Sequence, residues 1–160
     1  MERLTDISVI RELLGRHGFT FSKALGQNFL INPSVCPRMA QAAVENYEGT
    51  HRTKMSGSNN DAIPPNPSVT DPPPFTKGRQ RVGVIEIGPG IGVLTKELLE
   101  RAEKVVAVEL DKRLLPVLDE TLGDYENFKV VNADVLELDL HALIEEEFSG
   151  MEVVVCANLP

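Results

Sequence analysis

The sequence predicts an α/β fold in which helices cover both faces of a parallel sheet. From Arg81 onward, short apolar runs rich in Val and Ile alternate with segments of helical periodicity. Strands separated by helices pair in parallel through right-handed crossovers, which place the helices on the sheet faces. A glycine-rich loop, GPGIG, follows the first apolar run and opens a helix, as in doubly wound sheets that bind nucleotides.

The elements of this half follow from its periodicity. The expected elements alternate along the chain, as strands 81–87, 104–110, 128–134 and 152–158 and helices 93–102, 112–122 and 139–148. Pro116 lacks an N–H group, so it should kink the helix over 112–122 or restrict it to its first turns. The last strand, EVVVCAN, would be an apolar sheet edge unless further chain covered it.

The first half of the chain is helical before its periodicity is lost. A helix that ends at Gly15 or Gly18 is predicted by an apolar stripe, Leu4, Ile7, Ile10, Leu13 and Leu14. An aromatic, turn-rich segment follows. Asn32 and Pro33 then start a second helix that runs to about Tyr47.

Residues 49–80 differ in character from both flanks. They are rich in Pro, Gly, Ser and Asn, which predicts a mobile surface loop. We therefore divide the chain into an N-terminal helical segment that covers the ligand (1–48), an inserted loop (49–80) and the first part of a ligand-binding α/β domain (81–160).

The composition favours one soluble domain. The chain has 160 residues, of which 42% are hydrophobic, and it contains no run of the roughly 20 apolar residues that a membrane span needs. The N-terminus lacks the basic start and apolar core of a signal peptide. We expect a cytoplasmic monomer with no membrane partner.

The cysteines and histidines indicate no metal site. Cys36 and Cys156 are far apart and outside any C-x-x-C pattern, so we expect two small buried thiols. His17, His51 and His141 are scattered and lack the spacing of metal ligands. We therefore expect no bound metal.

The charge is divided unevenly along the chain. Residues 1–81 hold ten Lys/Arg and seven Asp/Glu, a net charge of +3, whereas residues 82–160 hold six and seventeen, a net charge of −11. A polyanion would therefore approach the first half. Because the total charge is −8, this chain by itself should bind nucleic acid weakly.

The spacing of the glycine loop distinguishes between ligands. Gly88 and Gly90 let the backbone approach a ligand closely, and Gly92 permits close helix packing. A dinucleotide fingerprint is G-x-G-x-x-G, but Val93 occupies the position of its last glycine, so a dehydrogenase is the least favoured reading. Glu86 places a carboxylate beside the loop, which disfavours a pyrophosphate and suits a cationic sulfonium ligand.

Acidic residues end the next two strands. Glu109 can accept two hydrogen bonds from ribose hydroxyls, a role shared by NAD and S-adenosylmethionine sites. Asp134 is placed to accept from an adenine amino group. Each acid could instead merely cap the helix that follows it. Their succession after the glycine loop favours a ligand site over coincidence.

Five motifs give the chain its resemblance to a known family. KALGQNFLINP, VIEIGPGIGVLT, VVAVELD, NADV and NLP resemble the ribosomal RNA adenine dimethyltransferases, the bacterial small-subunit (16S rRNA) enzymes in particular. GQNFL and NLP are the most specific. The resemblance excludes 49 to about 80, where the family has a short connection. It implies a Rossmann-like S-adenosylmethionine-dependent methyltransferase fold, truncated after the fourth strand, with an N-terminal helical extension.

The resemblance also implies which residues bind the cofactor. In the family, S-adenosylmethionine lies against the positions that match Asn28, Leu30, Gly88, Glu109, Asp134 and Asn158. Gly90 joins this set because it lets the backbone approach a ligand closely. From the residues alone, Gln27 and Asn28 would be turn or capping residues, and Phe29 would belong to the core.

NLP at 158–160 matches the catalytic turn of the family. The side-chain oxygen of Asn158 and the backbone carbonyl of Leu159 are suited to accept the two N–H bonds of an adenine amino group, whose nitrogen is a poor nucleophile. Pro160 fixes the turn. The target base must be unstacked, and the aromatic residue that follows NLP in the family would sandwich it.

The implied function is S-adenosylmethionine-dependent dimethylation of adenosines in 16S rRNA, with small-subunit rRNA or a 30S precursor as partner and a role in ribosome biogenesis. Lys23 and Arg38 are the candidate phosphate contacts, although surface solubility explains them about as well. We interpret the chain as an incomplete fragment that is inactive in isolation. The alternatives are a methyltransferase for DNA adenine, a protein amide or a small molecule, and a noncatalytic S-adenosylmethionine-fold protein that binds RNA or assists assembly.

Overall fold

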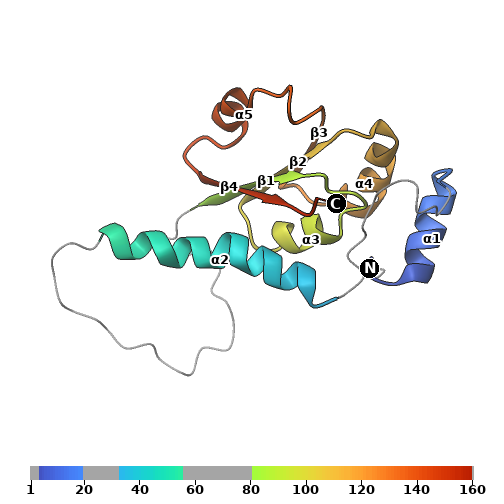
Figure 1. Cartoon of the computed structure of the whole chain (residues 1–160), viewed down its shortest axis with the longest axis horizontal. Helices are drawn as coiled ribbons and strands as arrows, with labels where there is room; N and C mark the ends of the chain where they lie inside the picture. Colours follow the sequence, from blue (N-terminus) through green and yellow to red (C-terminus); the bar gives the residue numbers. More distant parts are fainter. Residues whose placement is uncertain (1–3, 20–32, 56–80, 160) are drawn as a thin grey trace.

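A parallel four-stranded sheet forms the centre of the protein. The computed structural model describes residues 4–19, 33–55 and 81–159. All strand pairs are parallel in the spatial order β3-β2-β1-β4, with bounds β1 Val82–Ile87, β2 Lys104–Glu109, β3 Phe128–Asn132 and β4 Glu152–Ala157. Figure 1 shows helices on both sides of this sheet. The predicted Rossmann-like α/β fold is confirmed.

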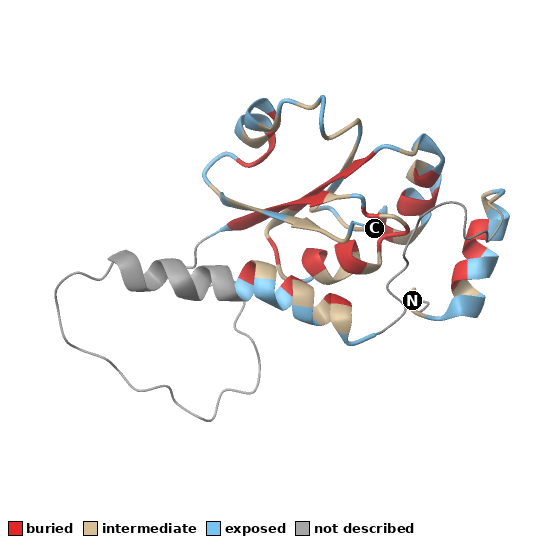
Figure 2. Ribbon diagram, viewed as in Figure 1, coloured by how far each residue is buried: buried red, intermediate tan, exposed pale blue. Residues whose placement is uncertain are grey.

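One face of the sheet is covered by three helices, α2 (Val35–Met55), α3 (Val93–Leu99) and α4 (Leu115–Leu122). Their apolar residues pack with inward residues of β1 and β2 to form the largest buried cluster, which includes Ala40, Val44, Val84, Leu94, Leu98, Val105, Leu118 and Leu122. Figure 2 shows buried residues, in red, in the central strands and in α3 and α4. Because side chains of a strand point alternately to the two faces of the sheet, Val82 and Val84 of β1 enter this cluster.

The opposite face is covered by α5 (Leu140–Glu147). Leu143 and Phe148 pack there with residues of β1 and β2, including Ile85 and Val106. The Phe148 ring lies so close to β1 that a Cβ on Gly83 would be 2.2 Å from its Cδ1 atom. Glycine is thus required in the middle of an apolar strand because a neighbouring ring occupies the space of a side chain.

The N-terminal helix α1 (Ile7–Arg16) has well-formed caps at both ends. At its start, the Asp6 carboxylate accepts a hydrogen bond of 2.8 Å from the Ser8 N–H. At its end, Gly18 adopts a φ of 74°, and the Phe19 N–H donates to the Leu14 carbonyl at 2.9 Å. These are features of a Schellman cap, for which glycine is favoured. Of the two predicted ends, Gly18 is the one used.

Two predicted helices differ from the observed ones. The helix expected over 33–47 runs from Val35 to Met55, so residues 49–55 of the expected loop are helical. GTHRTKM contains no proline, and a helix that is already formed propagates at little cost. The helix expected over 112–122 is divided into a 3₁₀ turn, η2 (Lys112–Leu114), and α4, with Pro116 in the first turn of α4. Proline is tolerated there because first-turn N–H groups have no partner in the helix.

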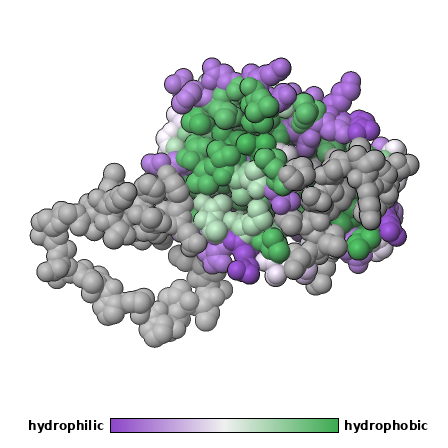
Figure 3. All heavy atoms as spheres, viewed as in Figure 1, coloured by the Kyte–Doolittle hydropathy of each residue, from purple (hydrophilic) through white to green (hydrophobic). Residues whose placement is uncertain are grey.

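β4 forms one edge of the described sheet, as its apolar sequence predicted. It pairs with β1, and Val155 is 53% exposed. Figure 3 shows apolar atoms gathered over β4 and toward α5. Of the helices that the structure describes, none combines the length and the apolarity of a membrane span.

Candidate functional site

The carboxyl ends of the four strands bring the candidate residues to one edge of the sheet. In the observed register Ile87 lies beside Ala157, and Glu109 lies beside Asn132. The residues that follow the strands therefore stand in the spatial order Asp134, Glu109, Gly88 and Asn158. Because neighbouring strands lie about 4.8 Å apart, this row is about 14 Å long. Such a row suits an elongated ligand laid across the strand ends.

The glycine loop presents its backbone at the centre of this row. Gly90 has a φ of 59°, and a Cβ built on it would meet no atom of residues 4–19, 33–55 or 81–159 within 4 Å, so these residues leave its side-chain position open. Gly92 has a φ of 88°, and its Cβ would lie 2.7 Å from the Leu122 Cδ1 atom. The prediction that Gly92 permits close helix packing is confirmed. The first glycine, Gly88, donates its N–H to the Val108 carbonyl at 3.0 Å.

Glu109 lies beside this loop with its carboxylate oriented by backbone groups. The Asp111 N–H donates to Oε1 of Glu109 at 2.8 Å. Burial raises the pKa of Glu109, and the backbone N–H groups of Asp111 and Gly90 oppose that rise by hydrogen bonding to the charged form. Since only 7% of Glu109 is exposed, its carboxylate is a largely desolvated acceptor directed at the glycine loop.

Asn132 stabilises the turn that carries Glu109, a role that the sequence argument did not identify. Its side-chain amide donates to the backbone carbonyls of Glu109 at 2.7 Å and Leu110 at 3.2 Å. A polar residue that ends an apolar strand next to an acid-bearing strand was the available signal. The pairing of β2 with β3 could not be read from the sequence alone.

Asp134 combines its position in the row with a local capping role. One of its carboxylate oxygens accepts from the Leu136 N–H at 2.9 Å, and its backbone carbonyl accepts from Glu137 at 3.1 Å. This half-buried side chain therefore caps a turn over 135–137 and not a helix, because the following helix, α5, is capped by Asp139. Capping does not remove Asp134 from the edge where the other candidate residues lie, because it fixes the turn at the end of β3.

Glu86 lies beneath the glycine loop, where it is nearly enclosed. It is 2% exposed, and burial raises its pKa to about 7, with a further contribution from Glu109 and an opposing one from the Thr95 hydroxyl. Within the described part of the chain, Oε2 of Glu86 and Oγ1 of Thr95 have no hydrogen-bond partner at ordinary distances and angles, so the Thr95 hydroxyl acts on Glu86 only by its proximity. The predicted carboxylate near the loop is therefore present, but it points into the protein between β1 and α3.

The turn after β4 folds against the first glycine of the loop. Asn158 is half-buried directly after the strand. Leu159 is 63% exposed, and its Cδ2 atom lies 3.6 Å from the position that a Cβ on Gly88 would occupy. The structure thus places the Leu159 side chain against the first glycine of the loop, and the register that sets Ile87 beside Ala157 brings the following turn to the same end of the sheet.

Other candidate residues lie away from this edge or outside the description. Arg38 is exposed on α2. Cys36 is buried with a pKa raised to about 11, mainly by burial, and Cys156 is partly buried. Four candidates fall outside the described residues, namely Lys23, Asn28, Leu30 and Pro160. The structure therefore brings together Gly88, Gly90, Glu109, Asp134 and Asn158 with Leu159.

Comparisons with known proteins identify the family of this chain. The sequence model of the family described as ribosomal RNA adenine dimethylase matches residues 18–160. A ribosomal RNA small subunit methyltransferase A from Alkaliphilus oremlandii is 41% identical over 160 residues, which are 100% of this chain and 44% of that protein. The protein of the same name from Geobacillus thermodenitrificans is 42% identical over 151 residues, 94% of this chain and 40% of that protein.

Among solved structures, a 23S rRNA methyltransferase, ErmE, is 24% identical with a TM-score of 0.46, over 82% of this chain and 48% of its own. The chain spans less than half the length of the curated relatives it matches. The family match covers most of the chain and includes the glycine loop, Glu109, Asp134 and Asn158. The chain therefore belongs to the ribosomal RNA adenine dimethylase family.

Proposed function

We propose that this chain binds S-adenosylmethionine along the carboxyl edge of its sheet and forms part of an enzyme that dimethylates adenosines of small-subunit ribosomal RNA. The observation that carries the proposal is the spatial order Asp134, Glu109, Gly88, Asn158. S-adenosylmethionine consists, in the same order, of adenine, ribose and a methionine that carries the methyl sulfonium. The next position in the row then belongs to the methyl acceptor.

The residues present suit this cofactor. Gly90 leaves the space of a side chain open beside the loop, and Glu109 offers a desolvated carboxylate to a pair of ribose hydroxyls. Asp134 stands where an adenine amino group would donate. When bound, the cofactor supplies an activated methyl group on a positively charged sulfur. The protein residues therefore need to bind and orient, and no strong base is required.

The turn after β4 would orient the acceptor. An adenine amino nitrogen is a poor nucleophile because its lone pair is delocalised into the ring. The Asn158 side-chain oxygen and the Leu159 carbonyl, in the turn whose Leu159 side chain lies beside Gly88, would accept its two N–H bonds and turn its lone pair toward the methyl group. With Pro160 they form the proposed catalytic turn.

We also propose that the partner is small-subunit rRNA, or a precursor of the 30S subunit, in the cytoplasm. Positive charge is concentrated in the first half of the chain, where Lys23 and Arg38 are the proposed phosphate contacts. Curated relatives named as small-subunit methyltransferases support this substrate. The enzyme to which these residues contribute would act as a monomer.

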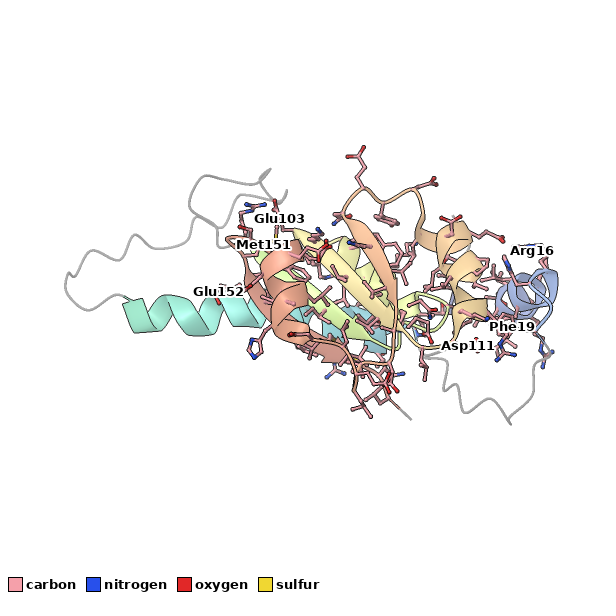
Figure 4. The ribbon with its side chains drawn as sticks, turned by 90° about the horizontal axis from the view of Figure 1, so that it is seen from above. Arg16, Phe19, Glu103, Asp111, Met151 and Glu152 are labelled. Atoms are coloured by element: carbon pink, nitrogen blue, oxygen red, sulfur yellow. The ribbon has the colours of Figure 1, made fainter. Side chains whose placement is uncertain are left out.

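The first test is calorimetric titration of S-adenosylmethionine into this chain and into a version extended through the natural C-terminus. We expect binding that Glu109→Ala weakens by at least about tenfold, because charge-assisted ribose bonds contribute about 1.5–3 kcal/mol. Glu103→Ala is the matched control, since Glu103 precedes the same strand at its opposite end, as Figure 4 shows. Absence of binding in both proteins would overturn the proposal.

Methyl transfer to small-subunit rRNA is the second test, with radiolabelled methyl donor and the extended protein. Asn158→Ala should abolish transfer, while the cofactor affinity should fall less than it does in Glu109→Ala. Equal transfer by Asn158→Ala would exclude the proposed catalytic turn. Cofactor binding without transfer to any RNA would favour the noncatalytic alternative.

A further inference from the structure

The end of α1 contacts the turn that follows β2 through a pair of residues far apart in sequence. The Arg113 guanidinium lies over the Phe19 ring, 5.2 Å from its centroid. This distance is within the range of a cation–π contact. Phe19 follows the C-terminal cap of α1, whereas Arg113 belongs to η2, directly after the strand that carries Glu109.

Arg113 is held in a fixed orientation by Asp111. Its Nε donates to Oδ1 of Asp111 at 2.9 Å, and its Nη2 donates to Oδ2 at 2.5 Å. The same Oδ1 accepts from the backbone N–H of Arg113 at 3.0 Å. A planar fork of this kind fixes both side chains, which a lysine could not do.

Asp111 in turn contacts the proposed cofactor-binding acid. Its backbone N–H donates to Oε1 of Glu109 at 2.8 Å. Phe19, Arg113, Asp111 and Glu109 therefore form a continuous series of contacts from α1 to the ribose-binding carboxylate. Figure 4 shows Phe19 and Asp111 at the same end of the protein, beside α1.

The buried face of α1 packs against the glycine loop and against η2. Ile10, Leu13 and Leu14 pack in one cluster with Ile91 of the glycine loop and Leu114 of η2. Ile91 is 1% exposed and Leu114 is fully buried. Phe19 is half-buried and packs against this cluster, whereas Arg113 is exposed, so Arg113 can be altered without removing a core side chain.

We propose that Arg113 is a positioning residue that holds the Glu109 carboxylate in place for the cofactor by joining Asp111 to the ring of Phe19. This inference rests on the proposed function, since it assumes that Glu109 binds the cofactor. Arg113 touches no reacting atom. Without it, the turn of Asp111 loses both the fork and its attachment to α1, and the N–H that orients Glu109 becomes mobile.

The test measures the dissociation constant for S-adenosylmethionine in the full chain by calorimetry. We expect Arg113→Met and Phe19→Leu each to raise it about two- to fivefold, the range for an exposed cation–π contact. The dissociation constant of the double variant should be about the same as that of the single variant with the lower affinity, because both substitutions remove the same contact. Phe19→Tyr retains the aromatic face and should restore normal affinity.

Arg81→Met is the matched control. Arg81 is a similarly exposed arginine paired with an acid, Glu103, at 3.1 Å, at the opposite end of the sheet. It should leave the affinity unchanged. Additive effects of Arg113→Met and Phe19→Leu, or equal effects of Arg113→Met and Arg81→Met, would overturn the inference.

Amide hydrogen exchange of Asp111 without ligand gives a second readout. Exchange should be faster in Arg113→Met and unchanged in Arg81→Met, and unchanged exchange in both would overturn the inference even if affinity fell. Loss of binding with Glu109→Ala but normal binding by Arg113→Met would reject the inference and leave the proposed function intact. Failure of the unaltered chain and of its extended version to bind would reject both.

Discussion

The side-chain amide of Asn132 donates a hydrogen bond of 2.7 Å to the backbone carbonyl of Glu109. The same amide reaches the carbonyl of Leu110 at 3.2 Å, so one residue at the end of β3 fixes the turn at the end of β2. This contact joins the neighbouring strands β3 and β2 at the sheet edge where the row of candidate residues lies. It makes the position of one candidate residue depend on a residue from another strand.

We expect Asn132→Ala to weaken S-adenosylmethionine binding about fivefold, since a hydrogen bond of this kind contributes about 1 kcal/mol. Asn132→Asp should weaken it further, because a carboxylate facing two carbonyl oxygens replaces a donor with a charged acceptor. Calorimetric titration measures both. Equal affinity in all three proteins would show that the turn keeps its position without this amide.

Glu86 should make the stability of the chain fall as the pH rises toward neutrality. Its folded-state pKa is about 7, against an ordinary value of 4.5, so the folded chain keeps a proton that the unfolded chain releases between these pH values. The contribution of Glu86 to the free energy of unfolding is therefore fully present below about pH 4.5 and is lost as the pH rises to about 7. The decline is of the order of 3 kcal/mol, since one pKa unit corresponds to about 1.4 kcal/mol.

Urea denaturation at a series of pH values measures this decline. Glu86→Gln preserves the shape of the side chain without a titrating proton, so it should flatten the pH dependence. The groups that face Glu86 are the Thr95 hydroxyl, the Glu109 carboxylate and the thiols of Cys36 and Cys156. Glu103→Gln serves as a control at a more exposed site, and a slope unchanged by Glu86→Gln would refute the assignment.

Substitutions at two glycines of the loop should differ in whether they mainly lower the cofactor affinity or the stability of the fold. Gly90→Ala adds a methyl group in open space, so we expect a cofactor affinity lower by at least about tenfold and a stability loss of about 1–2 kcal/mol from its positive φ. Gly92→Ala adds a methyl group 2.7 Å from Leu122, so its stability loss should be larger, about 2–4 kcal/mol. Urea denaturation and calorimetry on both variants check this contrast, which reversed effects would contradict.

Gly83 should be required for packing and not for binding. Gly83→Ala would place a Cβ 2.2 Å from the Phe148 Cδ1 atom, and we expect it to cost about 1–3 kcal/mol because the ring must move. Gly83 lies in β1 beside Lys104, at the end opposite to the ligand row, so the cofactor affinity should not change.

Phe148→Leu should recover part of the stability lost by Gly83→Ala, because a smaller side chain leaves room for the new methyl group. Thermal unfolding of the two single variants and the double variant measures this coupling. Strictly additive losses would indicate that the strain lies elsewhere.

The sequence predicted most elements because their signals are local. Short apolar runs rich in Val and Ile located β1 to β4, and Gly18 was one of two predicted ends for α1. Two predictions failed in extent. The second helix continues to Met55, since Gly49 is tolerated in a helix that has already formed. The helix over 112–122, which Pro116 was expected to kink or to restrict to its first turns, is divided into η2 and α4, with Pro116 in the first turn of α4.

The sequence by itself determined the fold class, the glycine loop and the acids at the strand ends, because periodicity, glycine spacing and strand-end residues are properties of neighbouring positions. Only the tertiary structure decided the contacts that cross between elements. Asn132 fixes the turn of Glu109, Phe148 excludes a side chain at Gly83, and Arg113 lies on Phe19. Each of these contacts joins residues that are far apart in the sequence, and strand order and helix packing bring them together.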